Sequence, residues 1–208
     1  VTIAVESGSQ RVLREILRKP VLLENVEEIA LAAKSVGLKT KAFFMLGIPG
    51  ETKAEMEQTI ELARKLRLDW SCFAITTPLP GTEMHQTCRD KGYIERDIPP
   101  VDVEYTTARI KTSDWDEEFV NKMWEKGNNL NFLENPNLEH GGNVDQAVFD
   151  LRRVIRMVPH HDNAHYALGL AYEKKGMIVE AIEEWKLVLR FNKIHRLAAD
   201  CLRRYDKV

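Results

Sequence analysis

The sequence predicts an α/β part built on parallel strands, followed by a part that is entirely α-helical. Three short apolar runs alternate with helical patterns in the first half of the chain, and such alternation implies parallel strands joined by helical crossovers. The first two runs end in the motifs Glu6–Ser9 and Leu46–Thr52, each of which opens a helix. Parallel α/β enzymes bind their ligands at this place, outside the carboxyl ends of the strands. The helical part is predicted by an internal sequence repeat near the C-terminus.

The first strand is expected at Val1–Val5, a short β-prone run that turn residues end. Ser7 and Gln10 have the spacing of a capping box, which predicts a helix from about Ser9 to Arg18. Pro20 ends that helix, because proline cannot continue it.

A second helix is expected at Leu23–Val36, followed by Gly37 as a C-terminal cap. Its predicted apolar face consists of Val26, Ile29, Ala30, Ala33 and Val36. Lys39–Leu46 then forms the second strand. The near-continuous apolar character of the strands indicates a parallel sheet that is covered on both faces.

Thr52 and Glu55 form a second capping box at the start of the next helix. The apolar face of this helix is predicted to be Met56, Ile60, Ala63 and Leu66. Trp70–Thr76 is the third strand, and the turn Pro78–Thr82 leads into a short helix that ends near Arg89. Three parallel strands leave two unpaired edges, so this region is expected to need more strands than the chain contains.

The middle of the chain has no clear period from Gly92 to Arg109, and we expect an irregular crossover there. Thr107–Lys111 is a candidate for a short extended piece. Ser113 and Asp116 mark a third capping box, followed by a long helix to about Phe132. Its inward side chains are predicted to be Trp115, Phe119, Met123 and Leu130.

Residues that lie 34 positions apart match in four pairs, namely Gly142 and Gly176, Ala147 and Ala181, Leu151 and Trp185, and Val154 and Val188. This period is the signature of tetratricopeptide (TPR) repeats. The second unit resembles that family at Leu168, Gly169, Tyr172, Gly176, Ala181 and Trp185. The first unit matches only from Gly142 to Pro159, and Ile194–Tyr205 is expected to be a following helix. Because about three repeats are usually required for stability, we expect these helices to dock on the α/β part or on a neighbour, or to belong to a longer array.

Two functions are open for the helical repeats. They recognise a protein partner in a concave groove, or they are a structural extension that binds nothing. His160, His161 and His165 lie in an inter-repeat turn and an early helix without a nearby cysteine, so we expect no metal site there.

The composition disfavours several classes of protein. The 208 residues include 30 basic and 32 acidic side chains, so no electrostatic footprint for nucleic acid is expected. No apolar run approaches the roughly 18 residues of a membrane helix, and no secretory signal is visible. Cys72, Cys88 and Cys201 show no metal-site spacing, and their odd number fits a reducing cytoplasm better than a disulfide framework.

The strand-end motifs have two interpretations. Gly47, Pro49 and Gly50 form a tight turn between strand and helix, or they let the backbone approach a ligand at the helix N-terminus. Glu6 is a carboxylate at the end of a buried strand and therefore needs a partner. Ribose hydroxyls or an amine of a ligand would supply one, and an arginine or a capping role would satisfy the carboxylate equally well.

Three segments taken in order are more specific than any one of them, namely Ile3–Leu13, Phe43–Thr52 and Thr77–Glu83. Together they resemble the C-terminal half of the radical S-adenosylmethionine (radical SAM) barrel. The subgroup most similar to them carries a cobalamin-binding domain ahead of the barrel. The resemblance covers about Val1–Tyr93, nearly half of the chain.

The resemblance implies a partial (β/α)6, TIM-like barrel, whose first half holds a [4Fe–4S] cluster on three cysteines. In that family the cluster reduces bound S-adenosylmethionine to a 5′-deoxyadenosyl radical, which abstracts hydrogen from a substrate. The cofactor-binding residues that the resemblance implies are Glu6 and Ser7 near the ribose or methionyl end, Phe44, Leu46 and Gly47 with their backbone beside the adenine, Pro49 and Gly50 in the turn that follows, and Pro78 and Pro80 at the top of the barrel. The catalytic residues stay unassigned.

The chain departs from the family pattern in what it lacks. It contains no CxxxCxxC motif, no motif for the methionyl amine and no cobalamin domain. Because Fe–S clusters are held mainly by Cys thiolates, this chain alone is expected neither to bind the cluster nor to form the radical. Since no initiator Met precedes Val1, we expect a fragment that is cut within a larger fold.

We therefore expect three parts: residues 1–112 as the half-barrel with its crossover, 113–142 as a connecting helix and linker with the boundary at Glu134–Asn143, and 143–208 as the repeats. The parent protein would be a radical enzyme acting in methyl transfer or rearrangement, with a repeat tail that recruits a partner. The alternative is a non-catalytic binding or scaffold protein built on a decayed half-barrel. An unrelated phosphate-binding α/β protein is disfavoured, because the chain has no Gly-rich loop ending in Lys-Ser/Thr.

Overall fold

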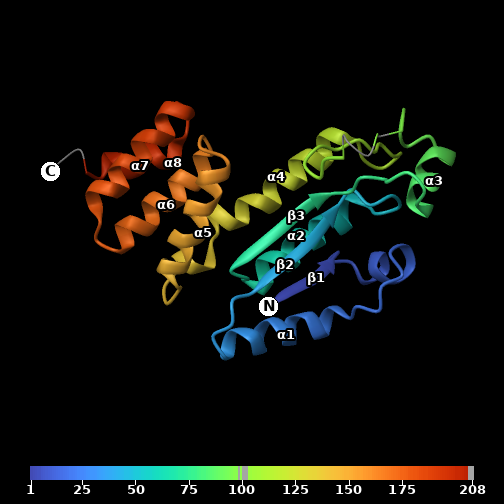
Figure 1. The fold of residues 1–208 in the computed structure, drawn as a ribbon, viewed down its shortest axis with the longest axis horizontal. Coiled ribbons are helices and arrows are strands. Elements are labelled where there is room, and N and C mark those ends of the chain that lie inside the picture. The colour runs from blue at the N-terminus through green and yellow to red at the C-terminus, as the bar shows by residue number, and fades with distance from the viewer. Residues whose placement is uncertain (98, 100–102, 206–208) are drawn as a thin grey trace. The chain divides into compact units, whose positions relative to one another are not determined.

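The computed structural model describes residues 1–97, 99 and 103–205 (Figure 1). The chain divides into two compact units, Val1–Asn128 and Asn129–Val208. The division falls inside helix α4 (Glu117–Leu133), upstream of the expected boundary at Glu134–Asn143. Over the described residues, no helix combines the length and the apolar character that crossing a membrane requires.

The first unit is built on a parallel sheet of three strands in the order β1 (Thr2–Glu6), β2 (Lys41–Leu46) and β3 (Trp70–Ile75). The register starts with Thr2, Lys41 and Trp70 side by side. The three expected strands and their parallel pairing are confirmed. Because all three strands run in the same direction, the segments that follow them meet at one edge of the sheet.

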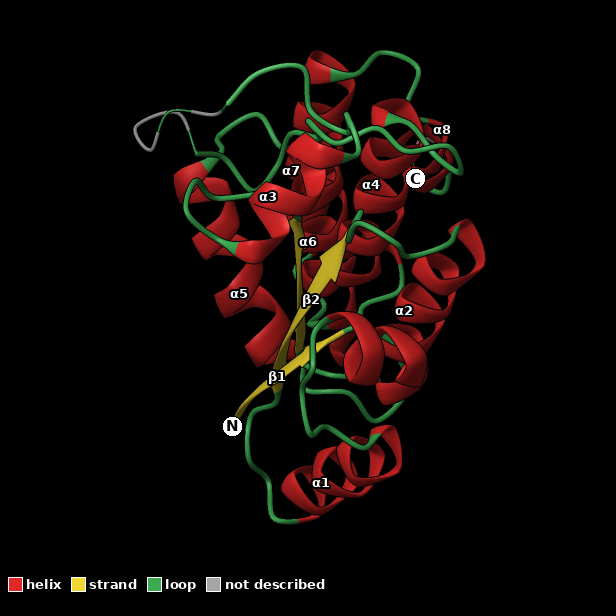
Figure 2. Ribbon diagram, turned by 90° about the vertical axis from the view of Figure 1, so that its right-hand side faces the viewer, coloured by secondary structure: helices red, strands yellow, loops and turns green. Residues whose placement is uncertain are grey.

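One face of this sheet is covered and the other is open. Helices α1 (Leu23–Ser35) and α2 (Lys53–Leu66) lie on the same side of the sheet (Figure 2). Phe44 and Leu46 of β2 point to the covered face and are fully buried, whereas Phe43 points to the other face and is 42% exposed. Parallel sheets are ordinarily covered on both faces, so the open face around Phe43 is unusual for this kind of sheet.

The first predicted helix is shorter than expected and differently wound. Val12–Ile16 form a π-helical turn (η1) that follows two α-helical residues, Gln10 and Arg11. The predicted capping box of Ser7 and Gln10 is wrong. The Ser7 hydroxyl accepts the Ser9 N–H, and the Ser9 hydroxyl accepts the Val12 N–H. The Gln10 side chain instead donates to the Val21 carbonyl and accepts the Leu23 N–H at the start of α1. Arg18, in the left-handed conformation with φ 53°, lies just beyond the π-helical turn.

Helix α1 is confirmed, but its apolar face is narrower than expected. Val26, Ala30 and Ala33 are buried, while Ile29 and Val36 are 48% and 70% exposed. The helix packs mainly against β1 and α2, so a narrow stripe of side chains is covered and the flanking positions face outward.

Helix α2 begins with the predicted capping box of Thr52 and Glu55, and the short helix α3 (Glu83–Asp90) is also confirmed. The start of α4 differs from the prediction. The carboxylate of Asp116 caps it by accepting the N–H of the third residue after it, at 2.9 Å, so Asp116 is the cap itself rather than the partner of Ser113.

The crossover between α3 and α4 is irregular, as expected, although residues 98 and 100–102 lie outside the described part. Thr107–Lys111 form no strand, because only isolated backbone hydrogen bonds join this region to other segments. Met123 and Leu130 on α4 are buried as predicted, and so is Trp115, which lies just ahead of the helix. The prediction is wrong for Phe119, which is half-buried beside the Lys53 ammonium, while its neighbour Val120 is buried instead.

The second unit consists mainly of four further helices, α5 (Val144–Met157), α6 (Asp162–Lys174), α7 (Ile178–Phe191) and α8 (Arg196–Arg203). Each packs against the next. The bounds of α7 follow those of α5 at the same offset as the matched pairs in the sequence, and the start of α8 follows that of α6 at this offset too. His161 and His195 share the offset, and each caps its helix through Nδ1. The period read from the sequence is therefore a period of helix bounds and caps.

The tightest contact between α6 and α7 joins a glycine and a tryptophan. Trp185 is fully buried, and its indole Nε1 donates to the Tyr166 carbonyl at 3.2 Å. A Cβ atom added at Gly169 would lie only 2.3 Å from this indole nitrogen. Glycine is required at position 169 because the two helices approach this closely.

Candidate functional site

The carboxyl end of β1 carries a strained residue. Glu6 has φ 71°, and the Ser7 N–H donates to the Val5 carbonyl at 3.0 Å across it. The register of β1 against β2 also shifts between Ala4 and Glu6. A tight turn with positive φ at a residue other than glycine is rare and costs free energy, and such strain is concentrated at functional sites.

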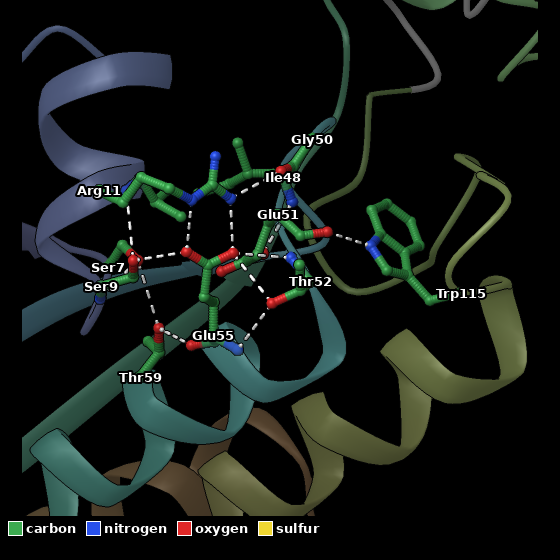
Figure 3. A network of polar contacts seen from close by, with 11 residues as sticks. Ser7, Ser9, Arg11, Ile48, Gly50, Glu51, Thr52, Glu55, Thr59 and Trp115 are labelled. Atoms are coloured by element: carbon green, nitrogen blue, oxygen red, sulfur yellow. Dashed lines mark hydrogen bonds and ion pairs between the residues drawn. The ribbon is translucent and has the colours of Figure 1, made fainter.

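A buried carboxylate joins the segments that follow β1 and β2. Glu55 accepts hydrogen bonds from Nε and Nη2 of Arg11, at 2.8 and 2.6 Å, and from the Ser9 hydroxyl at 2.7 Å (Figure 3). It also accepts from the N–H and hydroxyl of Thr52, at 2.9 and 3.0 Å. The Arg11 guanidinium, followed by these other donors, lowers the pKa of Glu55 to about 2. Glu55 is therefore a permanent anion that ties the two strand-end segments together.

The backbone of the first motif packs directly on helix α2. The Gly8 N–H donates to the Thr59 hydroxyl at 2.9 Å, and the Ser7 hydroxyl lies 3.4 Å from the same oxygen (Figure 3 labels Ser7 and Thr59). A Cβ added at Gly8 would meet the Gln58 carbonyl oxygen at 2.5 Å. Ser7 is fully buried. Its hydroxyl therefore organises the loop from inside.

A second buried carboxylate belongs to the turn after β2. Glu51 is 1% exposed, and its Oε2 accepts the Ile48 N–H at 3.0 Å while Oε1 has no partner among the described residues. Burial raises the pKa of Glu51 to about 8, so at neutral pH the side chain is mostly protonated. The Trp115 indole donates to the Glu51 carbonyl at 2.7 Å and anchors this turn to the segment ahead of α4 (Figure 3).

The predicted residues of the second motif lie at the end of β2, but most of their side chains are enclosed. Phe44 stacks on Phe73 with ring centroids 5.1 Å apart, and Leu46 is fully buried. Only their backbone is therefore free to meet a ligand. Gly47 has φ 75°, and a Cβ there would lie 3.0 Å from Val120. Glycine is required at position 47 by this conformation and by the close approach of Val120 on α4.

The remaining predicted residues differ in exposure. Pro49 and Pro78 are buried, whereas Gly50 and Pro80 are exposed. Gly50 has φ 91°, and its carbonyl accepts from the Arg11 guanidinium at 2.9 Å.

Sequence reasoning missed the cations that hold this edge together. Arg11 pairs with a residue 44 positions away, and Lys19 Nζ lies 2.5 Å from Oε1 of Glu6. Both follow the first motif within the predicted helix or just after it, so a search for basic residues near each strand-end carboxylate would have named them as candidates. Spacing alone could not pair them, because the partners meet only after the sheet has formed.

Comparison with known proteins shows what this part of the chain is similar to. Residues 1–63 match the model of the Radical SAM superfamily. The chain is similar to a cytidylyl-2-hydroxyethylphosphonate methyltransferase of Streptomyces wedmorensis, with 30% identity over 135 residues, which are 62% of this chain and 25% of that protein. It is also similar to a tRNA-2-methylthio-N(6)-dimethylallyladenosine synthase of Chromobacterium violaceum, with 38% identity over 93 residues, which are 44% of this chain and 21% of that protein.

An uncharacterised methyltransferase of Pyrococcus horikoshii is 38% identical over 84 residues, which are 40% of this chain and 18% of that protein. The chain thus spans a quarter or less of the length of these curated relatives. The matches support the radical SAM superfamily, a family of enzymes that use S-adenosylmethionine and an iron–sulfur cluster.

The residues of this chain do not fit the iron–sulfur cluster. Cys72 lies on β3, Cys88 on α3 and Cys201 on α8, and among the described residues no three His, Cys, Asp or Glu side chains gather as a metal site would require.

The carboxyl edge of the sheet carries two polar groups that bear on ligand binding. Glu6 supplies a carboxylate, and the Thr76 hydroxyl is buried without a partner among the described residues. Thr76 directly follows β3, and its N–H donates to the Leu46 carbonyl at 2.9 Å. A carboxylate and an unpaired hydroxyl at the ends of β1 and β3, the two strands that flank β2, are groups that hydroxyls and ring nitrogens of a nucleoside can satisfy.

Proposed function

We propose that this chain is the C-terminal part of a radical SAM enzyme and carries one side of its S-adenosylmethionine site. The observation that carries the proposal is the carboxyl edge of the parallel sheet. There the strained Glu6, the turn after Leu46 and the unpaired Thr76 hydroxyl follow three neighbouring strands. Bound S-adenosylmethionine would supply the radical chemistry after which the superfamily is named.

In this proposal the residues of the chain bind and orient the cofactor. Glu6 accepts the ribose hydroxyls, and the backbone from Phe44 to Gly47 lies beside the adenine. Ser7 acts through the loop that it organises, because its own side chain is buried. The exposed Pro80, in the turn after β3, borders the substrate side of the site.

The open face of the sheet supports a place for this unit inside a larger barrel. Phe43 is exposed on that face, and β1 has no neighbour on its outer edge among the described strands. The outer side of β3 is different, because the Trp124 indole of α4 donates to the Phe73 carbonyl at 2.9 Å. We propose that further strands of the parent barrel add at β1.

For the reaction of the parent enzyme, we propose a class of reaction without a particular substrate. Methyl transfer is favoured, because two of the similar proteins are named as methyltransferases. The proteins similar to this chain differ in substrate, since the name of one gives a cytidylyl phosphonate and the name of another gives a tRNA base. Rearrangement and the use of cobalamin, which the subgroup resemblance suggests, belong to the same proposal.

The helices of the second unit are proposed to be TPR-like repeats that recruit a protein partner. The recurrence of helix bounds and histidine caps at one constant offset supports this, as does the contact between Gly169 and Trp185. A structural extension without a partner remains the alternative. Pull-down of a defined partner by residues 129–208 that the Val1–Asn128 unit does not bind would favour recognition.

A non-catalytic binding protein is the second candidate function, and the lack of cluster ligands in this chain favours it. The deciding experiment begins with the source DNA upstream of Val1. An open frame that encodes three closely spaced cysteines supports the enzyme. The corresponding full-length protein, purified anaerobically and loaded with iron and sulfide, is then expected to release 5′-deoxyadenosine from S-adenosylmethionine on reduction. A start codon directly before Val1 would instead support the binding protein.

A further inference from the structure

A lysine holds the carboxylate at the end of the first strand. Lys19 Nζ lies 2.5 Å from Oε1 of Glu6, and the two side chains are 39% and 16% exposed. The other carboxylate oxygen, Oε2, makes no hydrogen bond to any residue that the structure describes. Glu6 therefore presents one oxygen that is fixed and one that is free to accept a donor from a ligand.

The backbone on both sides of this ion pair is constrained. Glu6 has φ 71° and follows the register shift in β1. Lys19 comes directly after Arg18, which has φ 53°, and its N–H donates to the Leu13 carbonyl at 2.8 Å. Pro20 restricts Lys19 from the other side. Because the backbone is fixed at both ends, less conformational entropy is lost when the two side chains meet.

A fixed carboxylate matters for recognising a hydroxyl. A hydrogen bond weakens steeply when the acceptor leaves the favoured geometry, so an acceptor must be held in place to discriminate between ligands. Glu6 is half-buried and has lost part of its hydration, and the Lys19 ammonium compensates for that loss. Without Lys19 the carboxylate would turn toward water.

We infer that Lys19 is a positioning residue for a ribose subsite, where it fixes Glu6 so that Oε2 accepts a hydroxyl of a nucleoside. The inference rests on the proposed function and adds a residue that lies outside the three strand-end motifs. Arg18 offers a matched control, because it belongs to the same turn but pairs with Glu83, and both of those side chains are largely exposed at 70% and 73%.

The test is calorimetric binding of adenosine and 2′,3′-dideoxyadenosine to the 208-residue chain. The wild-type chain is expected to bind adenosine at least about tenfold more tightly than 2′,3′-dideoxyadenosine, because a hydrogen bond to a charged acceptor contributes that much. Lys19→Met is expected to reduce this preference to about threefold or less, since the acceptor is no longer fixed. Lys19→Arg and Arg18→Met are both expected to keep the wild-type preference.

The outcomes separate the two proposals. Should Lys19→Met keep the wild-type preference while Glu6→Gln loses it, the role of Lys19 is refuted and the nucleoside site stands. A wild-type chain that binds neither nucleoside, or does not distinguish them, overturns the proposed nucleoside site and the role of Lys19 together. Circular dichroism melts report whether each variant folds, and Lys19→Gln replaces Lys19→Met if the latter does not.

Discussion

Replacing Glu51 by Gln should abolish a large pH dependence of stability in the first unit. Glu51 is 1% exposed, and burial raises its pKa from the ordinary 4.5 to about 8, with the nearby negative charge of Glu55 acting in the same direction. Gln is almost the same size and keeps an oxygen that can accept the Ile48 N–H, as Oε2 of Glu51 does now. The substitution therefore removes the titration while retaining the turn.

The sign and size of the effect follow from proton linkage. Between pH 4.5 and about 8 the folded chain keeps the Glu51 proton, whereas the unfolded chain releases it. The stabilisation that this proton provides is fully present below pH 4.5 and is lost as the pH rises to about 8. At about 1.4 kcal/mol per pH unit, the free energy of unfolding falls by at most about 5 kcal/mol across that interval. This is a large fraction of the stability of an ordinary domain, which is about 5–15 kcal/mol.

Urea denaturation between pH 4.5 and 9 measures this difference. The difference in unfolding free energy between wild type and Glu51→Gln should shift by several kcal/mol in favour of Gln as the pH rises, which isolates Glu51 from other titrating groups. Glu57→Gln, an exposed position on α2, serves as the control and should run parallel to wild type. Parallel curves for Glu51→Gln and wild type would refute the assignment of a buried, protonated carboxyl.

Three further effects are expected. Gly8→Ala should lower the unfolding free energy by about 3 kcal/mol, because the new methyl group meets the α2 backbone at 2.5 Å, and a loss below about 1 kcal/mol in urea melts would contradict that contact. Trp185→Ala should cost about 3–5 kcal/mol if the indole fills the space between α6 and α7, and a loss under about 1 kcal/mol would argue against the repeat packing. Glu184 raises the pKa of His165 above 6.5, so the stability that this pair provides is present below pH 6.5 and is lost as the pH rises through the folded-state pKa. His165→Asn should flatten that loss in hydrogen exchange of α6, and an unchanged pH profile would exclude the ion pair.

Local signals predicted the regular elements of the fold well. The three strands are short apolar runs bounded by turn residues, and the capping box of Thr52 and Glu55 fixes the start of α2 in the sequence itself. The capping box at Ser7 failed for a tertiary reason. Its hydroxyl bonds the Ser9 N–H and lies beside Thr59 of α2, so it is not available to cap the following turn.

The position of the candidate site was predictable from the sequence, but the pairing of its side chains was not. That Glu6 ends a strand and faces the carboxyl edge follows from the pattern of apolar residues. The ion pair between Lys19 and Glu6 depends on the π-helical turn and on the left-handed conformation of Arg18. The local sequence gives no clear signal for either feature. The sequence also could not show that Gly47 serves the approach of α4, because the partner Val120 lies more than 70 positions downstream.

The segment from Arg11 to Lys19 shows how the carboxyl edge is held. Arg11 binds Glu55 after β2, Lys19 binds Glu6 at the end of β1, and Arg18 binds the start of α3 after β3. The last pair is exposed, and exposed ion pairs contribute about 0–1 kcal/mol, so the segment after β3 is tied only weakly. The Glu55 carboxylate is 11% exposed and accepts from several donors at once, so removing one partner would leave a buried charge poorly satisfied. The ends of β1 and β2 are therefore held firmly together, and the turn that begins α3 is the more weakly held part of this edge.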